Sequence, residues 1–174
     1  MKILAISDVP SKLLWDESVR KRLEGIDLIL SCGDLPKKYL EYLTNFTTVP
    51  ILYVHGNHDG SYKESEPGGC ICVDDQVYVW KGLRIMGLGG SIRYNCEETF
   101  QYTEREMRRR MRRLWFKAHR AGGIDLLLTH SPAAGLNDGN DRAHKGFACF
   151  NDLLEEYQPK WFVHGHVHLC LLYT

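Results

Sequence analysis

The sequence predicts an α/β fold with an inserted antiparallel element. Short apolar runs with the length of buried strands recur along the chain, and segments with helical periodicity lie between them. The order is βαβαβ, then a hairpin, then αβαβ, which is typical of a sheet with crossover helices. We expect a single domain over residues 1–174, because this length suits one core and the chain has no repeat, low-complexity stretch or linker.

Five apolar runs are expected to form buried strands. Each is short and continuous rather than alternating, as in strands that are covered on both faces. Residues 76–90 predict an antiparallel hairpin, with its turn at Lys81-Gly82 between two strand-like arms. The five runs are residues 2–7 (KILAIS), 26–31 (IDLILS), 50–56 (PILYVHG), 124–130 (IDLLLTH) and 159–165 (PKWFVHG).

Four segments between the strands have helical periodicity. In the first, Leu14, Val19 and Leu23 fall roughly on one face, and Gly25 ends the helix. The last is ended by Pro159. The expected helices span residues 11–25, 35–45, 103–123 and 146–159.

Composition limits the classes of partner and compartment. Twenty-two basic residues balance twenty-two acidic ones, so the net charge indicates no polyanionic partner. No apolar run approaches the roughly 18 residues of a membrane helix, so we expect no membrane partner. The first residues lead straight into a strand-like run, without the features of a signal peptide. We therefore expect a cytoplasmic protein whose six cysteines are reduced and mostly buried.

Polar residues with metal-binding side chains follow every predicted buried strand. In open α/β sheets ligands bind beyond the carboxyl ends of the strands, so we expect these side chains to meet at one site. Oxygen and imidazole ligands without thiolates suit Mn, Fe or Zn. A lone aspartate would usually cap a helix and a lone histidine would usually pack structurally, but five coincident strand ends favour a metal centre. The residues are Asp8, Gly33-Asp34, Gly56-Asn57-His58-Asp59, His130 and Gly165-His166-Val167-His168.

In this order, the motifs D, GD, GNHD, H and GHVH resemble those of the calcineurin-like metallophosphoesterases, over Ile3 to His168. The resemblance implies a sandwich of two mixed β-sheets flanked by helices. It also implies two divalent metal ions bridged by an aspartate and a solvent molecule. The bridging carboxylate would be that of Asp34.

The resemblance assigns the remaining ligands and the catalytic group. Asn57, His130 and His166 would bind one ion, and Asp8 and His168 the other, in addition to Asp34. The implied reaction is hydrolysis of a phosphomonoester or phosphodiester substrate by a metal-activated hydroxide. His58 would assist the leaving group from beside the metals. We expect the neighbouring Asp59 to hold the loop rather than to orient the His58 ring.

The first motif departs from the family pattern, which usually has a histidine two residues after the aspartate. Pro10 stands there and offers no ligand atom. The first ion would keep Asp8, Asp34 and His168 with added water, so we expect this site to be weak or exchangeable. The alternatives are an enzyme with two ions, an enzyme with one tight and one exchangeable ion, and an inactive metal-binding scaffold for protein interactions. The intact His58 favours an active enzyme.

Two further residues are secondary candidates for substrate binding. Arg93 follows another strand-like run and has the fork geometry for phosphate, although a solvated arginine is slightly favoured. His144 lies in the polar, glycine-rich segment 135–147, which is long for a connection. Two interpretations of His144 are equally supported: it faces the substrate or a metal, or it is a surface histidine.

The expected helix over residues 103–123 is strongly basic. It has Met107, Met111, Leu114 and Ala118 at helical spacing, and eight basic residues against two glutamates. Nucleic acid or an oligomeric partner would suit such a segment, but an ordinary solvated helix face is favoured. The chain ends six residues after His168, where family members often continue with further strands. The sequence leaves that sheet edge and the oligomeric state open.

Overall fold

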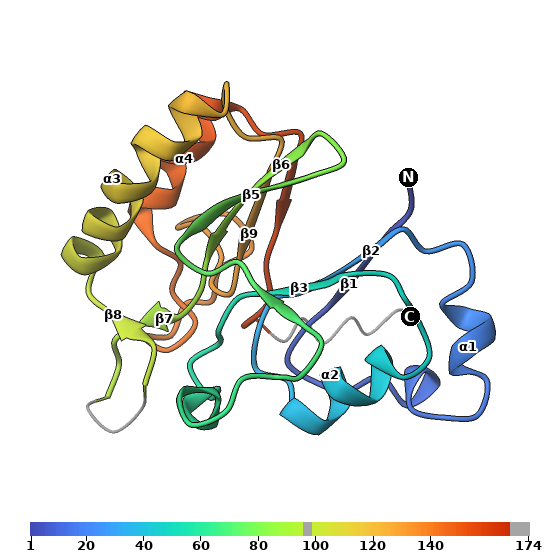
Figure 1. The fold of residues 1–174 in the computed structure, drawn as a ribbon. Coiled ribbons are helices and arrows are strands. Elements are labelled where there is room, and N and C mark those ends of the chain that lie inside the picture. The colour runs from blue at the N-terminus through green and yellow to red at the C-terminus, as the bar shows by residue number, and fades with distance from the viewer. Residues whose placement is uncertain (96–98, 168–174) are drawn as a thin grey trace, which may run out of the picture.

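The computed structural model describes residues 1–95 and 99–167 of the chain. Two four-stranded sheets pack against each other, and helices cover the outer face of each sheet (Figure 1). The predicted α/β class is confirmed, and so is the sandwich of sheets flanked by helices that the family resemblance implied.

The first sheet is parallel in all the pairings described. Its first three strands are those predicted from the apolar runs, whereas no sequence pattern indicated the short fourth strand. In sheet order they are β1 (Ile3–Ile6), β2 (Leu28–Ser31), β3 (Ile51–Tyr53) and β4 (Ile71–Cys72).

The second sheet is mixed, because its hairpin strand runs against the other three. The predicted hairpin is confirmed, and its turn residues Lys81 and Gly82 both have positive φ (46° and 84°), as in a type I′ turn. In sheet order the strands are β10 (Trp161–Val163), β9 (Leu126–Thr129), β6 (Leu83–Leu88) and β5 (Gln76–Trp80). A separate parallel pair, which was not predicted, comprises β7 (Ser91–Ile92) and β8 (Gln101–Tyr102).

Two helices lie on each outer face of the sandwich (Figure 1). The first sheet is covered by α1 (Val19–Arg22) and α2 (Lys37–Thr44), and the second by α3 (Glu104–Arg120) and α4 (Ala148–Tyr157). Two 3₁₀ turns, η1 (Lys12–Leu14) and η2 (Gly60–Lys63), complete the described helical elements. Within residues 1–95 and 99–167, no helix is both long and apolar enough to cross a bilayer.

The single helix predicted over residues 11–25 is wrong, because the segment divides into η1 and α1. Between them, the Asp16 carboxylate accepts a hydrogen bond from the Ser18 N–H at 2.7 Å. Such local side-chain bonds compete with helix formation. Leu14 and Val19 are nevertheless buried, so the apolar spacing predicted their burial but not a continuous helix.

The strands read as continuous apolar runs because both faces of each sheet are covered. Successive side chains of a strand point to opposite sides. Leu28 and Leu30 of β2 therefore pack between the sheets, in one cluster with Leu126 and Leu128 of β9. Ile29, which lies between them in sequence, packs in the layer beneath α1 and α2. This packing holds the strands in place, and the candidate site lies at the carboxyl ends of five of them.

An ion pair ties the start of the β9 segment to β6. Arg84 Nε and Nη2 contact the two carboxylate oxygens of Asp125, each at 2.8 Å. Hydrogen bonding from Arg84 lowers the pKa of Asp125 to about 2, from an ordinary value of 3.8. Because the folded-state pKa is depressed, the stabilisation is present above about pH 4 and is lost as the pH falls toward 2.

We expect Asp125→Asn to lower the urea midpoint of unfolding at pH 7, because the variant lacks a bidentate ion pair. The difference from the wild type should shrink as the pH is lowered from about 4 to about 2, where the wild-type carboxylate itself becomes protonated. Urea unfolding followed by circular dichroism at several pH values measures this. Glu155→Gln on the exposed side of α4 is the matched control. A difference that stays constant with pH would contradict the assignment.

Candidate metal centre

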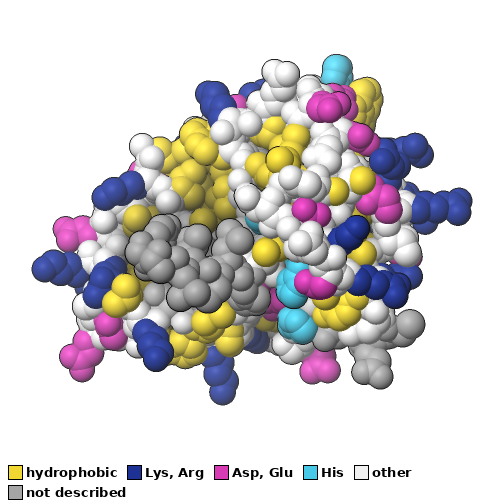
Figure 2. Space-filling view, turned by 180° about the vertical axis from the view of Figure 1, so that it is seen from behind, with side chains coloured by type: hydrophobic (Ala, Val, Ile, Leu, Met, Phe, Trp, Pro, Cys, Tyr) yellow, Lys and Arg dark blue, Asp and Glu magenta, His cyan; other side chains and the backbone are white. Residues whose placement is uncertain are grey.

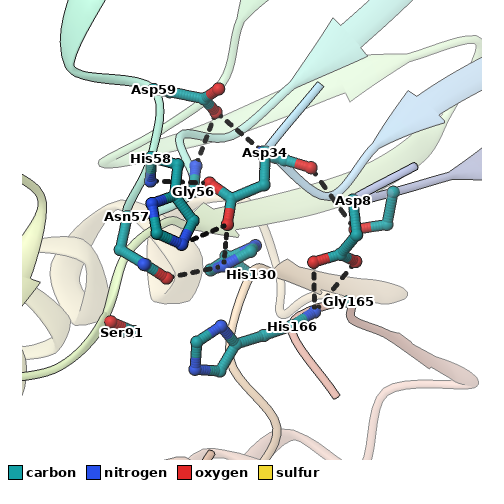
Figure 3. Close-up of polar contacts among 12 residues, drawn as sticks. Asp8, Asp34, Gly56, Asn57, His58, Asp59, Ser91, His130, Gly165 and His166 are labelled. Atoms are coloured by element: carbon teal, nitrogen blue, oxygen red, sulfur yellow. Dashed lines mark hydrogen bonds and ion pairs between the residues drawn. The ribbon is translucent and has the colours of Figure 1, made fainter. Parts of the chain in front are cut away.

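The carboxyl ends of β1, β2, β3, β9 and β10 meet at one place in the sandwich (Figure 3). The side chains predicted from these five strand ends come together there, except that His168 lies outside the described residues. Those that the structure brings together are Asp8, Asp34, Asn57, His58, His130 and His166.

A pair of glycines lets the loops after β2 and β3 touch. Gly33 has a φ of 95°, and a Cβ atom at this position would lie 2.3 Å from the Gly56 nitrogen. No side chain fits at that separation, so the close approach requires glycine. It brings Asp34 against the next loop, where Asp34 Oδ1 accepts the His58 N–H at 2.8 Å.

The Asp59 carboxylate holds these two loops together. It is buried, and its Oδ2 accepts hydrogen bonds from the N–H of Gly56 at 2.7 Å and from the N–H of Asp34 at 2.9 Å. Burial raises the pKa of this carboxyl above its ordinary value, against the opposing effect of the two N–H donors. The geometry agrees with the expectation that Asp59 holds the loop.

Three acceptor groups point at one another beneath these loops (Figure 3). His130 Nε2 lies 3.3 Å from Asp34 Oδ2 and 3.1 Å from Asn57 Oδ1. The Asn57 amide nitrogen donates to the Tyr94 hydroxyl at 3.1 Å, which turns the amide oxygen toward His130. Asp34 reaches this position with a φ of 57°, a left-handed conformation that is unusual for a residue with a side chain.

Backbone carbonyls fix which nitrogen of each histidine faces the centre. His130 Nδ1 lies 2.7 Å from the carbonyl oxygen of Cys32, and His166 Nε2 lies 2.7 Å from that of Ala143. A carbonyl oxygen only accepts, so these two nitrogens must carry protons. His130 Nε2 and His166 Nδ1 are thereby left as the nitrogens available to a metal. Outer hydrogen bonds of this kind orient histidine ligands in metal sites.

The Asp34 carboxylate favours positive charge at the centre. Burial alone would lower the pKa of His130, but hydrogen bonding and charge from Asp34 outweigh it and raise the pKa above its ordinary value. The direction of this shift means that the Asp34 carboxylate favours positive charge beside it. A divalent ion would supply the same charge to the carboxylate, amide and imidazole ligands together.

His166 completes a ligand set that suits one ion. Burial and the neighbouring His130 lower the pKa of His166 to about 4, so its ring is neutral near pH 7. One ligand atom each from Asp34, His130 and His166 lies within 4.8 Å of the other two. With the Asn57 amide oxygen, the set has two oxygen and two nitrogen ligands, which fits Mn, Fe or Zn.

Asp8 lies beside this group and is tied to two strand ends. Its two carboxylate oxygens accept the His166 N–H at 3.1 and 3.0 Å, and its own N–H donates to the Gly33 carbonyl at 3.0 Å. Pro10 lines a pocket of about 270 Å³ together with Asp8, Asp34 and His58. Pro10 offers no ligand atom there, and the weak first ion site remains a prediction.

His58 stands at the open side of the centre. Its side chain is 61% exposed, and its Nε2 lies 4.0 Å from Asp34 Oδ2. It is therefore next to a predicted ligand and reachable from solvent. This position suits a group that meets the substrate, while its catalytic role remains a prediction.

The two secondary candidates are placed differently. His144 lies next to the centre, with its ring centroid 5.3 Å from that of His166 and its Nδ1 2.8 Å from an Asp141 carboxylate oxygen. The Arg93 guanidinium instead contacts Glu106 of α3 at 3.0 Å. The position of His144 is compatible with substrate binding, whereas Arg93 is already engaged by a carboxylate.

Sequence reasoning missed the groups that orient the ligands. Tyr94 holds the Asn57 amide, and the carbonyls of Cys32 and Ala143 fix the two histidines. A backbone carbonyl leaves no mark in the sequence, because every residue has one. The length of the 135–147 segment was the one signal that pointed to a role near the site.

We expect His166→Ala to weaken binding of Mn²⁺ or Zn²⁺ by at least about 100-fold, because it removes a neutral, oriented imidazole. His58→Ala should leave this affinity within about threefold, since His58 is outside the ligand group. Isothermal titration calorimetry measures both, with elemental analysis for stoichiometry. His119→Ala, at an exposed histidine of α3, is the control. Unchanged metal affinity in a folded His166→Ala protein would contradict the assignment.

Comparisons with known proteins agree with this geometry. The family model for calcineurin-like phosphoesterases matches residues 1–170. One solved crystal structure is similar in fold, with a TM-score of 0.68 at 15% sequence identity, over 95% of this chain and 83% of that chain. The comparison with curated protein sequences gives no significant match. Because the family model spans nearly the whole chain, the protein belongs to the calcineurin-like phosphoesterase family.

Proposed function

We propose that the protein is a metal-dependent phosphoesterase that hydrolyses a phosphomonoester or phosphodiester. The observation that carries this proposal is the meeting of Asp34, Asn57, His130 and His166 with their ligand atoms turned toward one another. Family membership supports the reaction class. We also propose that residues 1–174 form one domain, which carries this activity.

The proposed ligand set divides between two positions. Asn57, His130 and His166 would hold one divalent ion with Asp34, and Asp8 and His168 would join Asp34 at a second, weaker one. Ions held there would lower the pKa of water and neutralise charge on the phosphoryl oxygens.

His58 would meet the leaving group. Its backbone N–H is held by Asp34 at 2.8 Å, and its exposed ring stands beside the pocket that Asp8 and Pro10 line. A protonated imidazole at this position would donate to the departing oxygen, which is otherwise a poor leaving group. The proton would come from His58 Nε2 or Nδ1, with the ring reprotonated from solvent.

Substrate contacts would come from the segment beside His166. Asp141 fixes Nδ1 of His144, so Nε2 of this ring is left to contact a phosphoryl oxygen. Arg93 would bind substrate only by leaving Glu106, and it ranks second. We also propose a cytoplasmic location, which the free thiols of Cys32, Cys70, Cys72 and Cys149 support.

One observation favours a second candidate function. Pro10 removes a ligand position from the first ion site, which would suit a metal-binding scaffold that makes protein contacts without turnover. The exposed His58 supports the enzyme, because a scaffold has no use for a histidine at the open side of the centre.

We expect hydrolysis of bis-p-nitrophenyl phosphate in the presence of Mn²⁺, with kcat reduced about 10²- to 10⁴-fold in His58→Ala. Metal content should not change in this variant. Release of p-nitrophenol measures the rate, and His119→Ala is again the control. Absence of hydrolysis by the wild type across Mn²⁺, Zn²⁺ and Fe²⁺, with both mono- and diester substrates, would favour the scaffold.

Restoring a ligand should strengthen the first ion site. We expect Pro10→His to raise the number of ions retained after dialysis and to lower the Mn²⁺ concentration that gives half-maximal activity. Pro10→Ala separates the gain of an imidazole from the removal of a proline. Elemental analysis and a metal titration of activity measure the two effects. If Pro10→His and Pro10→Ala behave alike, the missing histidine is not what limits this site.

A further inference from the structure

Helix α3 presents an arginine-rich face that the proposed reaction does not use. Its inner face is buried through Met107, Met111, Leu114 and Ala118. Its outer face is exposed. In Figure 2 dark blue side chains lie on the side of the molecule where α3 is, as they also do elsewhere on this view. We call this outer face the α3 basic face. Its exposed cations are Arg105, Arg109, Arg112, Arg113, Lys117 and Arg120.

Two other arginines of α3 have structural roles and do not belong to this face. Arg110 is buried, and its guanidinium contacts Asp74 at 2.7 Å and Asp75 at 2.8 Å. Arg108 pairs with Asp152 of α4 and with Glu104. By contrast, within residues 1–95 and 99–167 none of the six cations of the α3 basic face forms an ion pair with an acidic side chain.

The spacing of the six cations is unfavourable for an isolated helix. Residues four apart are neighbours on a helix surface, so Arg105 and Arg109, Arg109 and Arg113, and Arg113 and Lys117 are adjacent like charges. Such pairs destabilise a helix, and no ion pair among the described residues offsets them at these six cations. A bound polyanion would supply the negative charge that offsets these neighbouring cations.

An aromatic ring lies among these cations. Phe116 is 60% exposed, and the Arg120 guanidinium lies 5.9 Å from its ring centroid. Trp115 is 44% exposed next to it and stacks on His119, with centroids 5.5 Å apart and planes 10° apart. Exposed aromatic side chains within a basic surface are typical of proteins that stack unpaired bases while arginines bind the phosphates.

The N-terminal end of α3 is linked to the candidate metal centre by side-chain contacts. Glu106 in the first turn of α3 binds Arg93, and the adjacent Tyr94 accepts the hydrogen bond from Asn57. A strand laid along α3 toward its N-terminus would therefore run toward the centre. The remainder of the chain is net acidic, so a polyanion would be directed to α3 rather than to the whole surface.

We propose that the α3 basic face binds single-stranded nucleic acid. Arginine forks contact the phosphates, and a base stacks on Phe116. A single strand is favoured over a duplex because the stacking requires an unpaired base. It is favoured over an anionic membrane because Phe116 lies beside an arginine instead of within a broad apolar face.

Fluorescence anisotropy tests this with fluorescein-labelled U20 RNA and T20 DNA, and EDTA excludes any effect of hydrolysis. We expect both to bind, with affinity falling as salt rises. The combined variant Arg109→Gln, Arg112→Gln and Arg113→Gln should bind at least about tenfold more weakly at low salt. Its slope of log K against log salt should be smaller by about 2, at about 0.7 for each phosphate that the variant no longer neutralises.

A matched variant controls for net charge. Arg20→Gln, Lys21→Gln and Lys38→Gln remove three exposed cations from α1 and α2, and should change affinity less than about twofold. Phe116→Ala should weaken binding about fivefold with an unchanged salt slope, because stacking involves no counterion release. Hydrolysis of bis-p-nitrophenyl phosphate should be unaffected in all these variants.

Two results would overturn the proposal. Equal weakening in the α3 and control variants would mean that binding follows net charge and not this face. Binding to vesicles containing 30% phosphatidylserine, without binding to either oligonucleotide, would assign the face to a membrane surface. The oligonucleotide measurement does not depend on turnover. It therefore tests the α3 basic face even if the protein does not hydrolyse phosphoesters.

Discussion

One buried carboxylate, that of Asp59, accepts hydrogen bonds from the N–H groups of Gly56 and Asp34 and so joins the ends of two neighbouring strands. The rest of the centre depends on this junction. With the two loops held in contact, Asp34 faces the Asn57-His58 segment, and the other strand ends contribute their histidines from the opposite sheet. A carboxylate is suited to this task because it accepts two backbone N–H groups at once. The arrangement of the predicted ligands therefore depends on Asp59, which is not one of them.

His130 and His166 are oriented by donating hydrogen bonds, whereas Asp59 acts by accepting them. His130 and His166 each donate one ring N–H to a backbone carbonyl, which belongs to the strand end after β2 in one case and to the 135–147 segment in the other. Each ring is thus fixed in orientation and in tautomer before any ion arrives. The other ring nitrogen of His130 then faces the Asp34 carboxylate and the Asn57 amide oxygen, a group of atoms that favours positive charge.

The sequence predicted the strand ends well because two independent patterns agree there. Continuous apolar runs locate buried strands, and the polar residues directly after them identify the edge at which ligands gather. The helix over 11–25 could not be predicted correctly, since the Asp16–Ser18 hydrogen bond is a local competitor that apolar spacing does not register. Arg110 was equally hidden, because a buried arginine depends on Asp74 and Asp75 reaching it from another part of the chain. For the same reason, the sequence could not predict that the carbonyls of Cys32 and Ala143 contact the two histidines.

The backbone of the centre carries a further consequence. Asp8, Asp34 and His166 all have positive φ (60°, 57° and 68°), a region where glycine would be comfortable and a side chain costs on the order of 1 kcal/mol. At these three positions the fold and the chemistry make opposite demands. Glycine would relax the chain and remove the predicted ligand, whereas the present residues keep that side chain on a strained backbone. Glycine at these positions would therefore gain backbone freedom only by removing the side chains on which the proposed metal site depends.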